Sequence, residues 1–236
     1  MMDEEKGEAG PPQRPDDDAE AWKAKAALYR VVIERYKDYI SQNEQKTVPM
    51  LKSLVSPDDA TIQSIAGRIR EKIRQKKTEA AGGAVVESKD LEYSHENDFL
   101  DAAKESFAFV QSLKKADLDI GVSFWLSFCD IERLGVADPF DRALLLCSLL
   151  AALGSKSARV SVLALEDGSS HPVVLFEGAD GKKRLLDACN GKAAFEDSCG
   201  DDPSQLVQAF RSEQGLAAES AEYEFNREQY EESGQG

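Results

Sequence analysis

The segment from Asp138 to Gly154 constrains the fold more than any other part of the chain, because it predicts a helix that has no solvated face. Asp138 is a favourable N-cap, and Pro139 suits the first helical position. Residues 143–153 are apolar on nearly every side of such a helix, and Gly154 is a favourable stop. A helix without a polar face has to be surrounded by protein. The sequence therefore predicts a buried central helix.

Three strand-like runs follow this helix, at residues 159–165, 172–177 and 182–187. The Asp180-Gly181 pair between the last two runs is typical of a hairpin turn. Because a buried helix is followed by strands that pair in an antiparallel sheet, the sequence predicts an α+β fold.

The order and spacing of these segments resemble the transglutaminase-like (papain-like cysteine enzyme) superfamily, in its bacterial and archaeal form. The resemblance covers roughly residues 98–190. It implies a core in which a buried central helix packs on an antiparallel sheet, with an N-terminal helical extension. It also implies that His171 is the catalytic base and that Asp187 orients it. The matching residues are Ala137–Ala143, Leu153-Gly154, Ala158-Arg159-Val160, His171 and Asp187, with a lead-in at Phe124–Leu126 and Asp130–Gly135.

Pro139 departs from the family pattern, because it stands where the family has its nucleophilic Cys. A Cys at a helix N-terminus has its thiolate stabilised by the helix dipole and a neighbouring His, and its backbone N–H commonly helps to bind the oxyanion. Proline has neither a thiol nor an N–H. The sequence therefore predicts a degenerate His171–Asp187 dyad in a pseudoenzyme, a catalytically inactive protein that binds or scaffolds an unknown protein or peptide.

The competing hypothesis is a thiol amidase or peptidase in which Cys189 is a relocated nucleophile. Cys189 comes two residues after Asp187, so an uninterrupted strand would point both side chains to one face. Alternatively, Cys189 begins a turn at Asn190-Gly191 and only packs there. Cys147 cannot take the place of Pro139, because it lies about 12 Å farther along the helix at 1.5 Å per residue.

The four cysteines (Cys129, Cys147, Cys189 and Cys199) include no Cys-x-x-Cys pair, so neither a zinc site nor a disulfide framework is expected. Cys147 lies among leucines and is expected to be a buried thiol. His171 and Asp187 are too few ligands for a metal site, and no cofactor is expected. A purely structural interpretation is also open for these residues. His171 would then only bond to Asp187, and Asp141 would only be the acidic residue of the helix's first turn.

The N-terminal part of the chain predicts a long helix after an acidic tail. Residues 1–17 are expected to be disordered, and the helix is expected from about Ala19 to Gln42. An apolar stripe with heptad-like spacing runs along it from Trp22 to Ile40. Packing on the chain's own helices is the preferred interpretation, because the stripe is short for a coiled coil. The alternative is a helix-mediated homodimer.

Two more helices are expected, over residues 48–55 and from Ser56-Pro57 to about Lys77. The second combines a stripe of isoleucines with a face rich in Lys and Arg. Nucleic acid is an unlikely partner, because no nucleic-acid motif accompanies this face and the chain as a whole is acidic. A solvated face, satisfied by the acidic tails, is the favoured interpretation.

These signals divide the chain into an N-terminal helical region (18–77), a linker or loop (78–96), a transglutaminase-like core (97–212) and an acidic C-terminal segment (213–236). His95, within the loop, is expected to be a surface residue. The aromatic residues of the C-terminal segment indicate at most an edge strand.

The net charge of −15 is concentrated at the two ends of the sequence. Residues 1–20 carry eight acidic residues against two basic ones, and residues 212–236 carry seven against one. Such ends favour a solubilising role. Since no apolar run approaches the roughly 18 residues of a membrane span and no secretory signal is recognised, a soluble, cytoplasmic protein is expected.

Overall fold

The computed structural model describes residues 15–44, 46–82, 88–116, 125–165, 168–193, 207–208 and 218–232. The chain divides into two compact units. One unit comprises residues 1–45 and 118–124, and the other comprises residues 46–117 and 125–236. This division differs from the expected one, in which the helical region extended to residue 77.

The first unit contains the helix α1 (Pro15–Glu44). The predicted helix is confirmed, and it begins earlier than expected, so that residues 15–17 are helical rather than part of a disordered tail. Residues 1–14 lie outside the described residues. Trp22, Tyr29 and Tyr36 of the predicted apolar stripe are exposed on α1. The homodimer through this stripe remains a prediction.

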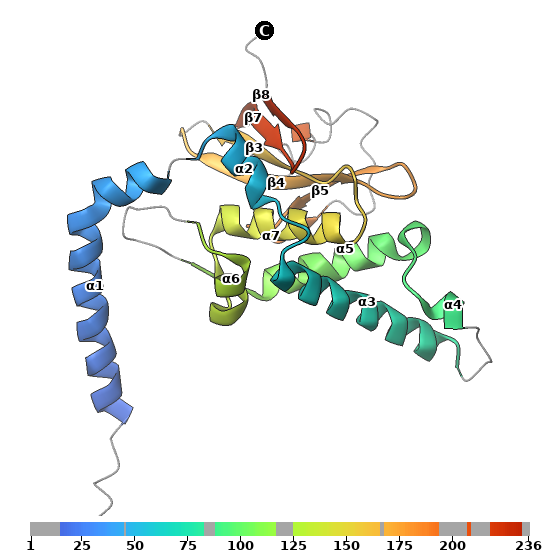
Figure 1. Ribbon diagram of the computed structural model, residues 1–236, viewed down its shortest axis with the longest axis horizontal. Coiled ribbons are helices and arrows are strands. Elements are labelled where there is room, and N and C mark those ends of the chain that lie inside the picture. Colours follow the sequence, from blue (N-terminus) through green and yellow to red (C-terminus); the bar gives the residue numbers. More distant parts are fainter. Residues whose placement is uncertain are drawn as a thin grey trace, which may run out of the picture. The chain divides into compact units, whose positions relative to one another are not determined.

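The second unit begins with helices and ends with a sheet (Figure 1). The short helix α2 agrees with the helix expected over residues 48–55. Among the described residues, no helix has the length and apolar character needed to cross a membrane. The helices are α2 (Val48–Leu54), α3 (Ala60–Ala80), α4 (Ser88–Leu91), α5 (His95–Ser112), α6 (Phe128–Leu134) and α7 (Pro139–Ala152).

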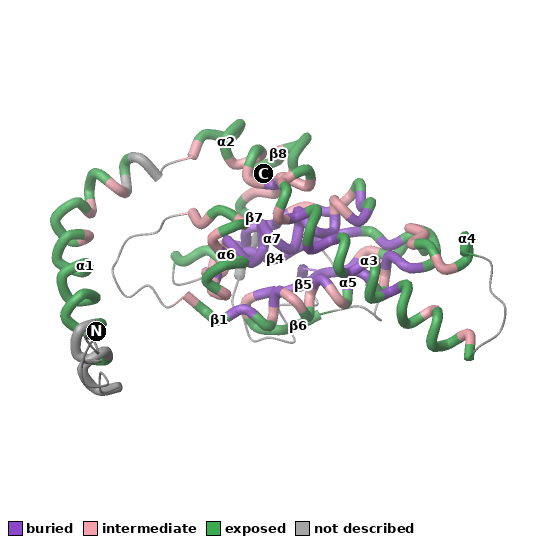
Figure 2. Tube along the Cα trace, turned by 60° about the horizontal axis from the view of Figure 1, so that its bottom comes forward, coloured by how far each residue is buried: buried purple, intermediate pink, exposed green. Residues whose placement is uncertain are grey.

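The α7 helix is the buried centre of this unit, as predicted. Its N-cap is Asp138, whose carboxylate accepts the Asp141 N–H at 2.7 Å, and Pro139 is its first residue. Residues 141–150 are all buried, and α7 packs against α3, α5 and strand β4 (Ser170–Glu177) (Figure 2). The helix is followed by Gly154 at a φ of +108°, a backbone conformation that favours glycine.

The main sheet has the strand order β6-β5-β4-β3-β7-β8, and all of its pairings are antiparallel. One face carries Val160, Val174 and Leu186, which belong to the same core cluster as the leucines of α7. The α+β fold is therefore confirmed. Besides β4, the strands are β3 (Arg159–Leu165), β5 (Lys183–Asp187), β6 (Lys192–Ala193), β7 (Ala218–Phe225) and β8 (Tyr230–Glu232); β1 (Lys114–Lys115) and β2 (Val136–Ala137) form a separate parallel pair.

The C-terminal segment corrects the sequence-based expectation of an acidic stretch with at most an edge strand. Strand β7 pairs with β3 on one side and with β8 on the other, so it lies inside the sheet. Phe225 is 1% exposed within the core, and Arg159 of β3 forms an ion pair with Glu224 of β7. The sequence does not indicate this strand clearly, because it has few large apolar residues and its glutamates resemble those of an acidic tail.

The loop expected over residues 78–96 also differs from the structure. Helix α3 extends to Ala80, α4 lies within the expected loop, and α5 begins at His95. The His95 ring stacks on Phe99, with ring centroids 4.6 Å apart, and it is half-buried rather than a surface side chain. Since α3 packs on both α5 and α7, the expected linker does not separate two compact units.

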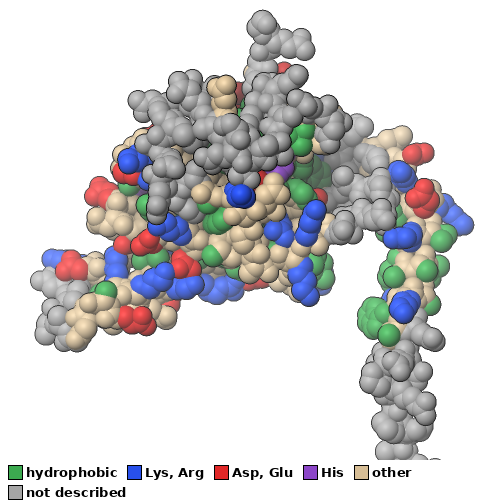
Figure 3. Space-filling view, turned by 180° about the vertical axis from the view of Figure 1, so that it is seen from behind, with side chains coloured by type: hydrophobic (Ala, Val, Ile, Leu, Met, Phe, Trp, Pro, Cys, Tyr) green, Lys and Arg blue, Asp and Glu red, His purple; other side chains and the backbone are tan. Residues whose placement is uncertain are grey.

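The basic face of α3 is balanced by acidic residues of the neighbouring helices. Its buried stripe of isoleucines is as predicted, although the N-cap is Asp59 rather than Ser56. Figure 3 shows Lys and Arg beside Asp and Glu on this part of the molecule. Within the described ranges, the acidic partners of these four cations come from α5 and α6. The ion pairs are Arg68–Glu132, Lys72–Glu105, Lys76–Glu105 and Lys77–Asp98.

Candidate active site

His171 and Asp187 come together because β4 and β5 are neighbouring antiparallel strands. The register pairs Val174 with Leu186. Continued by one residue, it places Asp187 opposite Val173, on the same face as His171. The His171 Nε2 atom lies 3.0 Å from Asp187 Oδ2, and the Asp187 side chain is fully buried. The predicted pairing of these two residues is thus present as a hydrogen bond.

The carboxylate of Asp187 also organises the turn that follows β5. Its Oδ1 accepts the backbone N–H groups of Cys189 at 2.8 Å and of Asn190 at 3.1 Å, and its Oδ2 accepts the Asn190 side-chain amide at 2.9 Å. Burial alone would raise the pKa of Asp187. The hydrogen bond and charge of His171, together with the two backbone N–H groups, outweigh burial and hold that pKa below its usual value.

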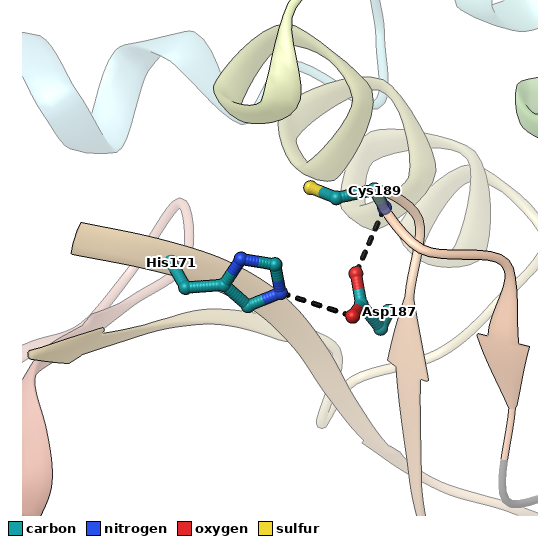
Figure 4. Close-up of side chains that lie close together, drawn as sticks. All are labelled: His171, Asp187 and Cys189. Atoms are coloured by element: carbon teal, nitrogen blue, oxygen red, sulfur yellow. Dashed lines mark hydrogen bonds and ion pairs between the residues drawn. The ribbon is translucent and has the colours of Figure 1, made fainter. Parts of the chain in front are cut away.

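Cys189 belongs to this turn, and the turn carries its side chain back toward His171 (Figure 4). The strand ends at Asp187, and Gly191 closes the turn at a φ of +72° by donating to the Asp187 carbonyl. One ring nitrogen of His171, one carboxylate oxygen of Asp187 and the Cys189 sulfur all lie within 4.8 Å of one another. Cys189 therefore begins a turn, as one alternative expected, and its sulfur also lies near His171 and Asp187, as the other expected.

The surroundings of Cys189 favour its thiol form over a thiolate. Its Sγ lies 3.7 Å from the carbonyl oxygen of Pro139 and 3.8 Å from that of Pro172, two acceptors for its single S–H. Burial, and then the charge of Asp187, raise the pKa of the Cys189 thiol to about 12, despite the opposing charge of Arg142. A reactive cysteine requires the opposite environment, one that lowers this pKa.

The first turn of α7, which begins beside this thiol, has two carboxyl groups with raised pKa values, Asp138 at the N-cap and Asp141. The pKa of Asp138 is raised by burial, although its hydrogen bond from the Asp141 N–H opposes the shift. Burial and the neighbouring Asp138 charge raise the pKa of Asp141 to about 7. Asp141 Oδ1 accepts the Leu126 N–H at 3.2 Å, whereas its buried Oδ2 has no hydrogen-bond partner among the described residues. Asp141 is thus a buried carboxyl group that fastens the segment before α6.

Arg142 is a residue that the sequence analysis missed. Its buried guanidinium donates to the carbonyl oxygens of Ala137, Leu113 and Ala188, and so ties α7 to the end of α5 and to the turn after β5. A lone Arg at the start of an otherwise apolar helix was the available signal, because a buried cation has to find acceptors.

The other predicted cysteines lie outside this site. Cys129 is exposed on α6, and Cys147 is fully buried in α7, as expected, where burial raises its pKa to about 12. Cys199 lies outside the described residues.

Comparison with known proteins gives structural similarity alone. No protein-family model matches the sequence, and no curated protein matches it. Three structures of LapG from Legionella pneumophila are similar to the chain. The first is 18% identical, with a TM-score of 0.41 over 69% of this chain and 87% of LapG. A calcium-bound form is 17% identical, with a TM-score of 0.39 over 68% of this chain and 87% of LapG. An EGTA-treated form is 21% identical, with a TM-score of 0.44 over 75% of this chain and 86% of LapG.

Proposed function

We propose that this protein is a catalytically inactive transglutaminase-like protein that acts by binding a protein or peptide segment. The observation that carries this proposal is the composition of the α7 N-terminus. Pro139 supplies neither a thiol nor an N–H, and the Asp141 N–H is already bonded to Asp138. A thiolate or an oxyanion at this end of the helix would meet a carboxyl group instead of hydrogen-bond donors.

The nearest thiol does not replace the missing group. Cys189 Sγ lies beside the carbonyl oxygens of Pro139 and Pro172, and no hydrogen bond joins it to His171 among the described residues. A thiol that donates to carbonyls and lies beside a carboxylate is stabilised in its protonated form. His171 and Asp187 then act as a structural pair that anchors the turn after β5.

A groove between α3 and α5 supports a binding role. It has a volume of about 310 Å³, which lies at the lower end of the range for ligand sites. Ile65 and Ile69 line it as buried side chains, and Phe109 is half-buried beside them. The exposed cations Arg68 and Lys72 form ion pairs with Glu132 and Glu105, which an acidic residue of a bound segment would replace. This combination suits a segment that carries both apolar and acidic residues.

A peptide-display library panned against the full chain tests this binding role. We expect enrichment of peptides with apolar and acidic residues. Binding should fall by at least about tenfold in an Arg68→Glu, Lys72→Glu double variant, because opposite charges are replaced by like charges. Arg74→Glu is the matched control, since Arg74 lies exposed on the same helix outside the groove. Failure to enrich any peptide, or equal loss in the control, contradicts the binding role.

The second candidate function is a thiol amidase or peptidase that uses Cys189, His171 and Asp187. The observation in its favour is that a sulfur, a ring nitrogen and a carboxylate oxygen lie within 4.8 Å of one another. A nucleophile, a base and an orienting group at this spacing need only a small movement to form a catalytic triad. The state of the thiol therefore separates the two candidates.

Alkylation of the native protein by iodoacetamide, with EDTA present and each cysteine followed by mass spectrometry, measures that state. We expect Cys189 to react slowly at about pH 6 and no faster than an ordinary thiol as the pH rises. Cys129, which is exposed, is the internal control. Rapid labelling of Cys189 at about pH 6 that disappears in His171→Ala overturns the inactive assignment and establishes an activated thiolate.

A further inference from the structure

The cluster of His171, Asp187 and Cys189 contains three different kinds of metal ligand. Their donor atoms lie within 4.8 Å of one another, and no other group of three or more His, Cys, Asp or Glu residues with this property occurs in the part of the chain that the structure describes. From the sequence only His171 and Asp187 are apparent as ligands, because the turn that brings Cys189 back toward His171 depends on tertiary structure.

Imidazole, thiolate and carboxylate together are the ligands that Zn²⁺ uses in proteins. With Zn–N and Zn–O bonds of about 2.0–2.2 Å and a Zn–S bond of about 2.3 Å, tetrahedral ligand atoms lie roughly 3.3–3.7 Å apart. The His171–Asp187 pair is 3.0 Å apart, and the longest separation in the cluster is at most 4.8 Å. Adjustments on the order of 1 Å would therefore bring all three donors to bonding positions.

The surroundings hold these ligands in place while leaving one of them accessible. Two backbone N–H groups fix Asp187 Oδ1, and the amide of Asn190 contacts Oδ2. Such outer hydrogen bonds orient the ligands of natural metal sites. The Asp187 side chain is fully buried, whereas that of His171 is 13% exposed, which gives an ion a route from solvent.

We propose that His171, Asp187 and Cys189 form a binding site for a zinc-class divalent transition-metal ion, with a fourth position left for water or an external ligand. On binding, the Cys189 S–H bond breaks, a metal–sulfur bond forms and the thiol proton passes to the buffer. The His171 nitrogen that binds the ion also gives up its proton, which moves to the other ring nitrogen or, from an imidazolium, to the buffer. No electron transfer takes place. The ion replaces the thiol proton and compensates the buried charge of Asp187.

This inference goes beyond the proposed function, because it requires neither a peptide ligand nor an activated nucleophile. It also has different readouts. Peptide binding at the α3–α5 groove does not involve the three metal ligands, and alkylation is measured in EDTA. A negative result in either experiment therefore does not contradict the metal site, and a negative metal titration does not contradict the peptide-binding role.

Cobalt titration of the full chain, freed of metal by EDTA treatment and dialysis, tests the site. We expect one Co²⁺ per chain, a thiolate-to-cobalt absorption band, and loss of that band when Zn²⁺ is added. Cys189→Ser should abolish the band and His171→Ala should weaken binding by at least about tenfold, whereas Cys129→Ser should leave both unchanged. Absence of a thiolate band in the wild-type protein, or its persistence in Cys189→Ser, overturns the proposal.

A second measurement keeps the proposal testable if a site variant fails to fold. In the wild-type protein at about pH 8, Zn²⁺ should slow alkylation of Cys189 by at least about tenfold and leave the rate at Cys129 unchanged, because a metal-bound thiolate is shielded from the reagent. Equal rates at Cys189 with and without Zn²⁺ contradict the site.

Discussion

The sulfur of Cys189 lies 3.7 Å from the carbonyl oxygen of Pro139, although 50 residues separate the two in the sequence. The turn after β5 therefore rests directly on the first turn of α7. Gln111 of α5 and Arg142 of α7 both donate to the Ala188 carbonyl in the same turn. The candidate site is built where three elements meet, and its stability depends on buried polar contacts among them.

Asp141→Asn should make the protein more stable at neutral pH. The pKa of Asp141 rises from 3.8 to about 7 on folding. Below about pH 4 both states keep the proton. Between about pH 4 and 7 the unfolded state releases it first, so the stability of the wild-type protein falls with pH and levels off above about 7.

The asparagine variant lacks this fall. At about 1.4 kcal/mol per pKa unit, the variant's free energy of unfolding would exceed that of the wild-type protein by roughly 4 kcal/mol above pH 7. Because the wild-type structure relaxes around the ionised carboxylate, we expect a difference of about 1–3 kcal/mol. Urea denaturation at several pH values measures the difference, with Asp130→Asn on α6 as the control. A pH dependence identical to that of the wild-type protein would show that Asp141 ionises freely in the fold.

Asp187→Ala should destabilise the protein by roughly 2–4 kcal/mol, because it leaves several buried donors around the turn without an acceptor. These donors are His171 Nε2, two backbone N–H groups and the Asn190 amide. Asp130→Ala removes a surface ion pair with Arg133 and should cost less than about 1 kcal/mol. Chemical denaturation in EDTA compares the two, and equal effects would contradict the structural role of Asp187.

Arg142→Met should destabilise the protein by roughly 1–3 kcal/mol while the apolar stem is retained. The Leu113 carbonyl oxygen loses the guanidinium donor, and the carbonyl oxygens of Ala137 and Ala188 each lose one of two donors. Arg133→Met, on the exposed side of α6, is the matched control. Thermal unfolding followed by circular dichroism measures both variants. If Arg142→Met lowered the melting temperature no more than Arg133→Met does, water would be the donor that replaces the guanidinium at these carbonyl oxygens.

Removal of residues 217–236 should prevent stable folding of the second unit. Strand β7 hydrogen-bonds along β3, and Phe225 is almost completely buried in the core. Truncation after residue 232, which keeps β7 and β8, is the control. Hydrogen exchange at the β3 amides reports the result. Retained protection in the shorter chain would show that this segment is dispensable.

The exposed aromatic residues of α1 allow a test of the alternative prediction, a helix-mediated homodimer. Trp22, Tyr29 and Tyr36 are 66%, 53% and 54% exposed, respectively. Burial of such aromatic residues between two copies of the helix would stabilise a homodimer. Sedimentation equilibrium should show a concentration-dependent dimer that is lost in Tyr29→Asp and kept in Lys23→Asp. A monomer at every concentration would eliminate the helix-mediated dimer.

Local sequence signals determined the central helix, its cap at Asp138, its end at Gly154 and the hairpin at Gly181. These features follow from side-chain periodicity and from turn residues, which act within a few positions of the chain. The pairing of His171 with Asp187 was also predictable, although it came from the resemblance and not from spacing alone.

Tertiary structure alone decided where Cys189 points and that β7 lies within the sheet. It also decided that the cations of α3 pair with Glu105, Glu132 and Asp98. The physical reason is the same in each case. The direction of a side chain beyond a strand end, or the partner of a charge, depends on hydrogen bonds and ion pairs with elements remote in sequence. Side-chain periodicity records burial and does not record which remote element provides it.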